Sequence, residues 1–166
     1  MKLISPGLLD ELAAAAAASP RGRTHYNLHG SAADPVQRYL VVADRRSYFR
    51  PHRHTTRAEL ALIVRGELDL VLFDAARRVT ARYGFGAGAG NIAYENDPGI
   101  WHTVVVRADA TAFLEVKQGP YDPATASEFA DWAPAEGDPD VAGFLEWARH
   151  AAPGDTVPAR RDAAGD

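Results

Sequence analysis

The sequence contains no cysteine, and this absence excludes several classes of site. Disulfide bonds, thiolate zinc sites, iron–sulfur clusters and cysteine nucleophiles all require a thiol. No run of about eighteen uncharged apolar residues is present, so the sequence predicts no transmembrane helix. Asp10 and Glu11 stand where a signal peptide would need its apolar region. Together these absences predict a cytoplasmic protein without a membrane partner.

Lysine is also scarce, and the charges are unevenly distributed along the chain. Of the 18 basic residues only Lys2 and Lys117 are lysines, and the net charge is −4. Residues 1–119 carry 15 basic against 12 acidic groups, whereas residues 120–166 carry 3 against 10. An acidic C-terminal part does not suit a nucleic-acid-binding surface, so we predict no nucleic-acid partner. Its simplest interpretation is a solvated surface.

The N-terminal 20 residues are predicted to form a helix. Ser5 followed by Pro6 is typical of an N-cap and a first helical position. The alanine run that follows has high helix propensity, which places the helix at residues 6–18.

Most of the remaining chain is predicted to be β-structure. From about residue 36 to 118, short apolar or alternating runs such as "ELALIV" and "WHTVVVRA" are separated by turn signals such as "NDPG". Many short strands at even spacing favour an all-β sandwich or barrel, here assigned to residues 21–120. Residues 121–152 are predicted to be a loop and a helix packed on the barrel. Residues 153–166 are predicted to be a disordered tail.

The segment "RPHRHTTRAEL" concentrates groups that bind metals. His52 and His54 lie on one face of an extended segment, because side chains of a strand alternate in direction. Glu59 follows after a short turn, and His102 begins a later apolar strand after Pro-Gly. Imidazoles and a carboxylate suit a divalent transition metal, and we expect one zinc, iron, manganese or nickel ion per chain.

The spacing of these residues resembles the two metal motifs of the cupin superfamily. The pattern is His-x-His-x4-Glu-x6-Gly followed, some forty residues later, by Pro-Gly-x2-His. The resemblance implies a double-stranded β-helix (cupin or jelly-roll) barrel with short helices at both ends, and a centre of three histidines and one glutamate inside it. The chain departs from the usual motifs at Arg46, Gly90, Asp97 and Val106, which are turn and barrel-end positions rather than ligands.

A more specific resemblance covers residues 21–148. The segments "RGRTHYNLHGSAADPVQRYL", "RPHRHTTRAEL", "GIWHTVV" and "LEVKQGPYDPATASEFADWAPAEGD" are similar to WbuC-type cupin fold metalloproteins. That family occurs with O-antigen gene clusters, and no reaction is firmly assigned to it. The resemblance implies a role linked to surface polysaccharide biosynthesis. Cupins commonly pair through sheet edges, which implies a homodimer.

Other polar side chains alternate along the predicted strands so that they could face the same cavity. An arginine there would bind a carboxylate, phosphate or sugar hydroxyl in a fixed geometry. Each of these residues also fits an ordinary surface ion pair. The acid–base candidates are Lys117, Glu115 and His29, and the substrate-binding candidates are Arg50, Asn27 and Gln37.

The sequence leaves several functions open. The first is a metal-dependent enzyme, isomerase- or epimerase-like, in which the ion acts as a Lewis acid on a small polar, sugar-like molecule. A second is a non-catalytic, metal-dependent module that binds a small molecule or carbohydrate. An Fe(II) dioxygenase and a metal-free structural barrel are further alternatives.

Overall fold

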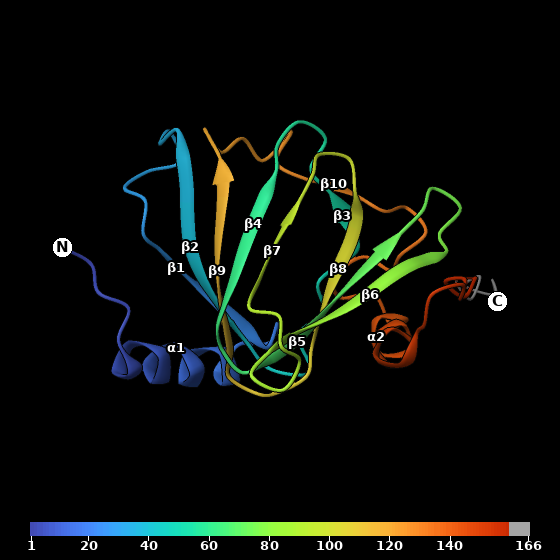
Figure 1. The fold of residues 1–166 in the computed structure, drawn as a ribbon, viewed down its shortest axis with the longest axis horizontal. Coiled ribbons are helices and arrows are strands. Elements are labelled where there is room, and N and C mark those ends of the chain that lie inside the picture. The colour runs from blue at the N-terminus through green and yellow to red at the C-terminus, as the bar shows by residue number, and fades with distance from the viewer. Residues whose placement is uncertain (160–166) are drawn as a thin grey trace.

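Two five-stranded antiparallel sheets form the protein, and the predicted all-β jelly-roll barrel with short helices at both ends is confirmed. The computed structural model describes residues 1–159, and Figure 1 shows the two sheets face to face. The first sheet has the strand order β1-β2-β9-β4-β7 and the second β10-β3-β8-β5-β6.

The first sheet consists of β1 (Arg23–Asn27), β2 (Val36–Ala43), β9 (Thr111–Gln118), β4 (Glu59–Arg65) and β7 (Ala93–Asn96). The second sheet consists of β10 (Glu128–Phe129), β3 (His52–Arg53), β8 (Trp101–Val106), β5 (Glu67–Phe73) and β6 (Val79–Gly86). The helices are α1 (Pro6–Ala18) and α2 (Val141–His150). No helix among residues 1–159 is long and apolar enough to cross a membrane.

The N-terminal helix has the bounds that the sequence predicts. The Ser5 side chain caps α1 by accepting a hydrogen bond from the Leu8 N–H (3.2 Å), and Pro6 occupies the first turn. Leu9 and Ala16 are buried against Leu40 on the outer face of the first sheet. Figure 1 shows α1 beside β1 and β2, at the opposite end from the C-terminus of β9.

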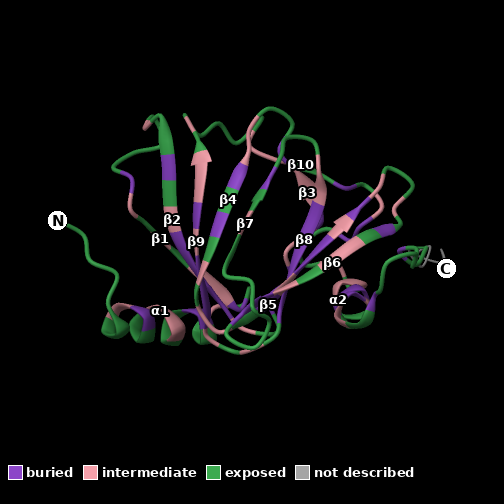
Figure 2. Ribbon diagram, viewed as in Figure 1, coloured by how far each residue is buried: buried purple, intermediate pink, exposed green. Residues whose placement is uncertain are grey.

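The apolar core is divided among three places, and Figure 2 shows its buried residues along the strands. One cluster fills the barrel interior between the sheets and includes Leu68, Val104 and Phe113. A second lies between the second sheet and α2, and the third lies under α1. Burial of apolar side chains on both faces of the strands explains why segments such as "LALIV" lack a simple alternation.

The C-terminal segment packs partly on the barrel. Phe144 and Ala148 of α2 contact the second sheet's outer cluster. Thr156 forms an isolated antiparallel bridge with Arg78, and Val157 is 2% exposed. The first part of the segment that the sequence predicts to be disordered is therefore placed against β6, because Val157 adds apolar area to the outer cluster. Residues 160–166 of the predicted tail lie outside the described residues.

The motif glycine Gly66 is required by the turn between β4 and β5. Its φ is +77°, a region that residues with a Cβ rarely adopt. A Cβ at this position would also lie 2.8 Å from the Thr111 Cα. The turn therefore brings β5 against the start of β9, which extends from there to the polar end of the barrel.

Candidate metal centre

The four predicted ligands lie together between the two sheets. One ligand atom from each of His52, His54, Glu59 and His102 lies within 4.8 Å of the others. His52 on β3 pairs directly with His102 on β8, and Glu59 begins β4 in the facing sheet. His54 lies just beyond β3, and its carbonyl accepts a hydrogen bond from the Gly99 N–H of the second motif (2.8 Å).

Backbone carbonyls set the orientation of all three imidazoles. The Nδ1 of His52 lies 2.9 Å from the Arg50 carbonyl oxygen, and the Nδ1 of His102 lies 2.9 Å from that of Ile100. The Nδ1 of His54 lies 2.6 Å from the carbonyl oxygen of Ala126. Since a carbonyl only accepts, each Nδ1 carries the proton, and the Nε2 lone pairs are left as ligands.

Two features show that these residues fit a cation. The buried Nε2 of His54 has no hydrogen-bond partner among the described residues. The Nε2 of His102 lies 2.9 Å from Glu59 Oε2, although its Nδ1 already donates to a carbonyl. A neutral imidazole cannot donate from both nitrogens, so this contact needs a second proton or a shared cation. The cluster could therefore hold a metal ion.

Burial keeps His52 neutral as well. The surrounding protein disfavours its charged form, and the neighbouring His102 adds to the effect, so the pKa of His52 is lowered to about 3. A neutral imidazole is the form that binds a metal.

Glu59 is part of a buried charge chain. Lys117 Nζ lies 2.7 Å from Glu59 Oε1 and 2.9 Å from Glu115 Oε2. Burial opposes ionisation of Glu59, but Lys117 together with His102 and His54 outweighs it, so the carboxyl pKa lies well below its usual range. Burial likewise disfavours charged Lys117, but Glu115 and Glu59 outweigh it and hold the ammonium pKa well above its usual range. Glu59 thus has one oxygen on Lys117 and the other facing the imidazoles.

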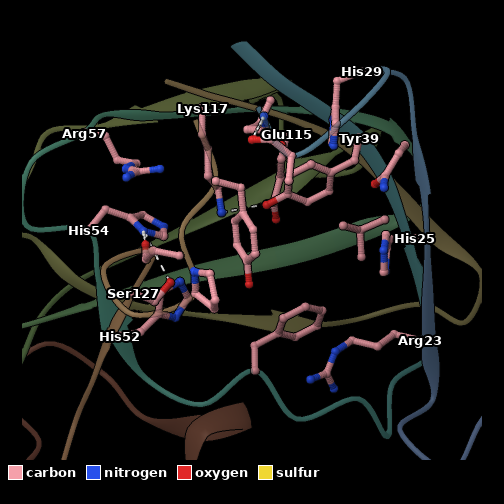
Figure 3. A pocket seen from close by; sticks show the side chains of 18 of the residues that line it. Arg23, His25, His29, Tyr39, His52, His54, Arg57, Glu115, Lys117 and Ser127 are labelled. Atoms are coloured by element: carbon pink, nitrogen blue, oxygen red, sulfur yellow. Dashed lines mark hydrogen bonds and ion pairs between the residues drawn. The ribbon is translucent and has the colours of Figure 1, made fainter. Parts of the chain in front are cut away.

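A cavity of about 740 Å³ adjoins the cluster. It is reached by His52 and His54, whereas Glu59 and His102 lie deeper and are almost fully buried. Figure 3 shows His52, His54 and Arg57 on one side of this cavity and Arg23 and His25 on the other. The six residues predicted to be catalytic or substrate-binding all line it: Lys117, Glu115, His29, Arg50, Asn27 and Gln37.

Three of these six residues are already hydrogen-bonded to the backbone, namely Arg50, Gln37 and His29. The Gln37 side-chain amide donates to the Asp34 carbonyl (2.8 Å) and so holds the loop before β2. The His29 Nδ1 accepts a hydrogen bond from the Arg38 N–H (3.0 Å), which leaves its Nε2 for the cavity. Gln37 therefore shapes the cavity wall, while His29 keeps one free nitrogen.

Sequence reasoning missed several lining residues. Tyr39 follows Gln37 at the strand period of two and lies under Lys117 (5.5 Å from Nζ to the ring centre), so alternation along β2 could have identified it. Arg23 and Arg57 also line the cavity and gave no motif signal. Asn96 lies beside the metal ligands rather than in this lining, and it gave no signal either. Asn96 pairs with Glu59 across β7 and β4, and its buried Nδ2 has no hydrogen-bond partner among residues 1–159.

The acidic segment after β9 forms part of the site rather than a merely solvated surface. Its strand β10 pairs with β3, and the Ala130 N–H donates to the Pro51 carbonyl (2.9 Å). The same segment provides the Ala126 carbonyl for His54, and Ser127 and Phe129 line the cavity. It therefore covers the metal-ligating strand and orients one ligand.

Comparison at the level of sequence gives one family match and no function. A family model described as "Domain of unknown function (DUF6016)" matches residues 4–85. A search of the curated proteins finds no significant match.

Solved structures with similar folds include a cupin. A cupin 2 domain-containing protein from Halorhodospira halophila is 19% identical over 73% of this chain and 81% of its own, with a TM-score of 0.51. KdgF from Halomonas sp. is 14% identical over 64% of this chain and 86% of its own, with a TM-score of 0.50. Oxalate oxidase in complex with the substrate analogue glycolate is 15% identical over 68% of this chain and 57% of its own, with a TM-score of 0.50. The chain therefore has the cupin fold, with a cluster of three histidines and one glutamate that could hold a metal ion.

Proposed function

We propose that the protein is a metal-dependent enzyme that acts on a small polar, sugar-like molecule bound in the cavity beside the metal centre. The observation that carries this proposal is the orientation of the three imidazoles. Each is held by a backbone carbonyl at Nδ1, and the buried Nε2 of His54 has no hydrogen-bond partner among the described residues. Such preorganisation is costly in a protein that binds no cation there.

The ion would be one zinc, iron, manganese or nickel per chain, held by His52, His54, Glu59 and His102. A bound divalent ion supplies Lewis-acid chemistry, which polarises a carbonyl oxygen of an isomerase or epimerase substrate. Both the choice of metal ion and the isomerase- or epimerase-like reaction belong to this proposal.

The chain's own residues would then handle charge and protons. The raised pKa of Lys117 keeps it protonated, so it suits stabilisation of developing negative charge rather than proton abstraction. Glu115 and His29 line the same cavity. Glu115 is the proposed proton acceptor, whereas His29, whose Nδ1 already accepts a hydrogen bond, carries its proton on Nε2 and is the proposed proton donor. Arg50 and Asn27 would contact the substrate, and Gln37 would act through the loop that it holds.

The WbuC-type motifs support a substrate linked to surface polysaccharide biosynthesis. They include "RPHRHTTRAEL" around the metal ligands and "EVKQGPYDP" at the end of β9. The position of the second segment adds support. It contains Glu115 and Lys117, which line the cavity, and it leads into the acidic segment after β9 that covers β3.

Binding without turnover is the second candidate. It is favoured by the mutual neutralisation of Lys117 and Glu115, whose side chains lie 2.9 Å apart. A carbohydrate-binding or sensor module would bind a ligand saturably and release it unchanged. Product formation from any member of a panel of sugar phosphates and nucleotide sugars would exclude this candidate.

A homodimer is also proposed. Leu60, Leu62 and Val64 of β4 are each about two-fifths exposed on the outer face of the first sheet, where a second copy would cover them. Sedimentation equilibrium would show a single species of twice the chain mass, and a monomer at micromolar concentration would contradict the proposal.

The metal proposal is tested by elemental analysis of the purified protein. The wild type should contain about one transition-metal ion per chain, and the variant with His52→Ala and His54→Ala should contain almost none. His150→Ala is the matched control, because His150 is exposed on α2 and, within residues 1–159, pairs only with Glu146. Equal metal content in wild type and double variant would refute the proposal.

A further inference from the structure

Two arginines beside the metal centre differ from most others in the described chain. Among residues 1–159, the arginines generally form an ion pair with a carboxylate, as Arg53 does with Glu128 (2.9 Å). The exceptions are Arg50, Arg57 and Arg77, which form no such ion pair. Arg50 and Arg57 line the cavity, whereas Arg77 lies in the turn between β5 and β6, outside it.

Backbone carbonyls hold both cavity arginines. Arg50 Nη2 donates to the Ala130 carbonyl (2.6 Å), and its buried Nε has no hydrogen-bond partner among the described residues. Arg57 Nη1 donates to the carbonyls of Gln118 (3.0 Å) and Pro120 (3.3 Å). These contacts fix the side chains without neutralising their charge. Both guanidinium groups therefore keep N–H donors and a full positive charge.

Their positions in the sequence place them next to the ligands. Arg50 precedes His52 by two residues and provides the carbonyl that orients it. Arg57 precedes Glu59 by two residues, and Figure 3 shows it on the same side of the cavity as His54. A molecule that reaches the metal centre through the cavity would therefore meet both cations.

The rest of the cavity does not cancel this charge. The chain has a net charge of −4, yet the cavity lining contains five basic and only two acidic residues. Both acidic residues form ion pairs with other basic side chains: Glu115 pairs with Lys117, and Glu136 pairs with Arg21 and Arg23. A cavity of this kind attracts anions in a protein that repels them overall.

We propose that Arg50 and Arg57 recognise an anionic group, so that the substrate of the cavity is a carboxylate- or phosphate-bearing small molecule rather than a neutral sugar. The inference rests on the proposed function and narrows its substrate class. Guanidinium groups form charge-assisted, often bidentate hydrogen bonds with both anions, which is the shared chemistry of the two candidates.

Calorimetric titration of the metal-loaded protein with glucose, glucose 6-phosphate and glucuronate tests this inference. At least one charged probe should bind the wild type about tenfold or more tightly than glucose, and the preferred probe identifies the anion. Arg50→Gln and Arg57→Gln should each weaken binding of that probe about tenfold, and glucose binding should change little. Raising the salt concentration should reduce the difference between the probes.

Arg77→Gln is the matched control, because Arg77 also lacks a carboxylate partner but lies outside the cavity. It should bind every probe like the wild type. If Arg50→Gln does not fold, Arg57→Gln still tests the inference, since Arg57 is only partly buried and its side chain donates its hydrogen bonds, among the described residues, to backbone carbonyls.

Metal analysis of the same samples separates the two proposals. Normal metal content with unchanged affinity in both arginine variants overturns the anion inference and leaves the metal proposal standing. Wild-type protein without metal overturns the proposed function, even if the arginine variants lose anion binding. Charged probes that bind no more tightly than glucose also overturn the inference.

Discussion

The two ends of the barrel interior have opposite chemistry, although the same strands run through both. Strand β9 carries Phe113 at one end and Glu115 and Lys117 at the other. Strand β8 carries His102 near its start and Val104 two residues later, inside the apolar cluster. Because side chains two residues apart share a face, each inward row changes from apolar to charged within one or two steps.

This difference shows how stability and function are separated in one small fold. The apolar end excludes water and contributes hydrophobic free energy. The polar end contains buried charges, which are tolerated because Lys117 lies between Glu59 and Glu115 and because the cluster suits a cation. Substitutions at the apolar end should therefore reduce the stability of the chain without removing metal. Substitutions at the polar end should remove the metal and, with it, only the stability that metal binding adds.

The largest expected effect is at the apolar end. Phe113→Ala should lower the free energy of unfolding by about 3–5 kcal/mol, because Phe113 is fully buried and its removal leaves a cavity. Urea denaturation measures this change. Tyr83→Ala is the control, since Tyr83 is 49% exposed and should cost much less. A Phe113→Ala protein that folds but has lost its metal would contradict the separation of the two ends.

The next effect is at the polar end. Adding the bound metal at a hundredfold excess over its Kd should raise the free energy of unfolding by about 2.7 kcal/mol, because the ion binds the folded chain. Thermal melting with and without a chelator measures the shift. The variant with His52→Ala and His54→Ala should show no shift, while Phe113→Ala should show the full one. A chelator that leaves wild-type melting unchanged would favour a metal-free barrel.

The smallest effect concerns the cavity wall opposite the metal ligands. Burial tends to raise the pKa of Glu136, but hydrogen bonding from Arg21 and the charge of Arg23 outweigh it, so that pKa is lowered. A carboxyl whose pKa is lowered in the folded protein contributes stability above its unfolded pKa near 4.5. This contribution is lost as the pH falls below that value. Glu136→Gln should therefore cost less than about 1 kcal/mol at pH 7, and the difference should shrink below pH 4.5.

Urea denaturation at pH 7 and at pH 3.5 would measure the Glu136 effect. Glu95→Gln is the control, because Glu95 is exposed and forms no ion pair among the described residues. A Glu136→Gln penalty that grows as the pH falls would have the wrong sign for a lowered pKa.

The predicted ligands illustrate what could be read from the sequence. His52 and His54 were placed on one face by strand alternation, yet β3 contains only His52 and Arg53, and His54 lies beyond it. The four residues nevertheless lie together, because the Pro-Gly turn before His102 and the pairing of β3 with β8 bring the two motifs side by side. The spacing of these residues in the sequence was sufficient to identify the four members of the cluster. It was not sufficient to predict the length of β3.

The sequence by itself determined the helix at residues 6–18, the all-β class and the four clustered side chains, because these depend on capping, periodicity and turn residues that are local in the chain. The tertiary structure alone decided how the imidazoles are oriented and which cation pairs with Glu59. The Ala126 carbonyl that orients His54 is 72 residues away in the chain, and the lysine that pairs with Glu59 comes from β9. The tertiary structure also decided which arginines have no carboxylate partner, because the fold determines which carboxylates lie within reach of each guanidinium group.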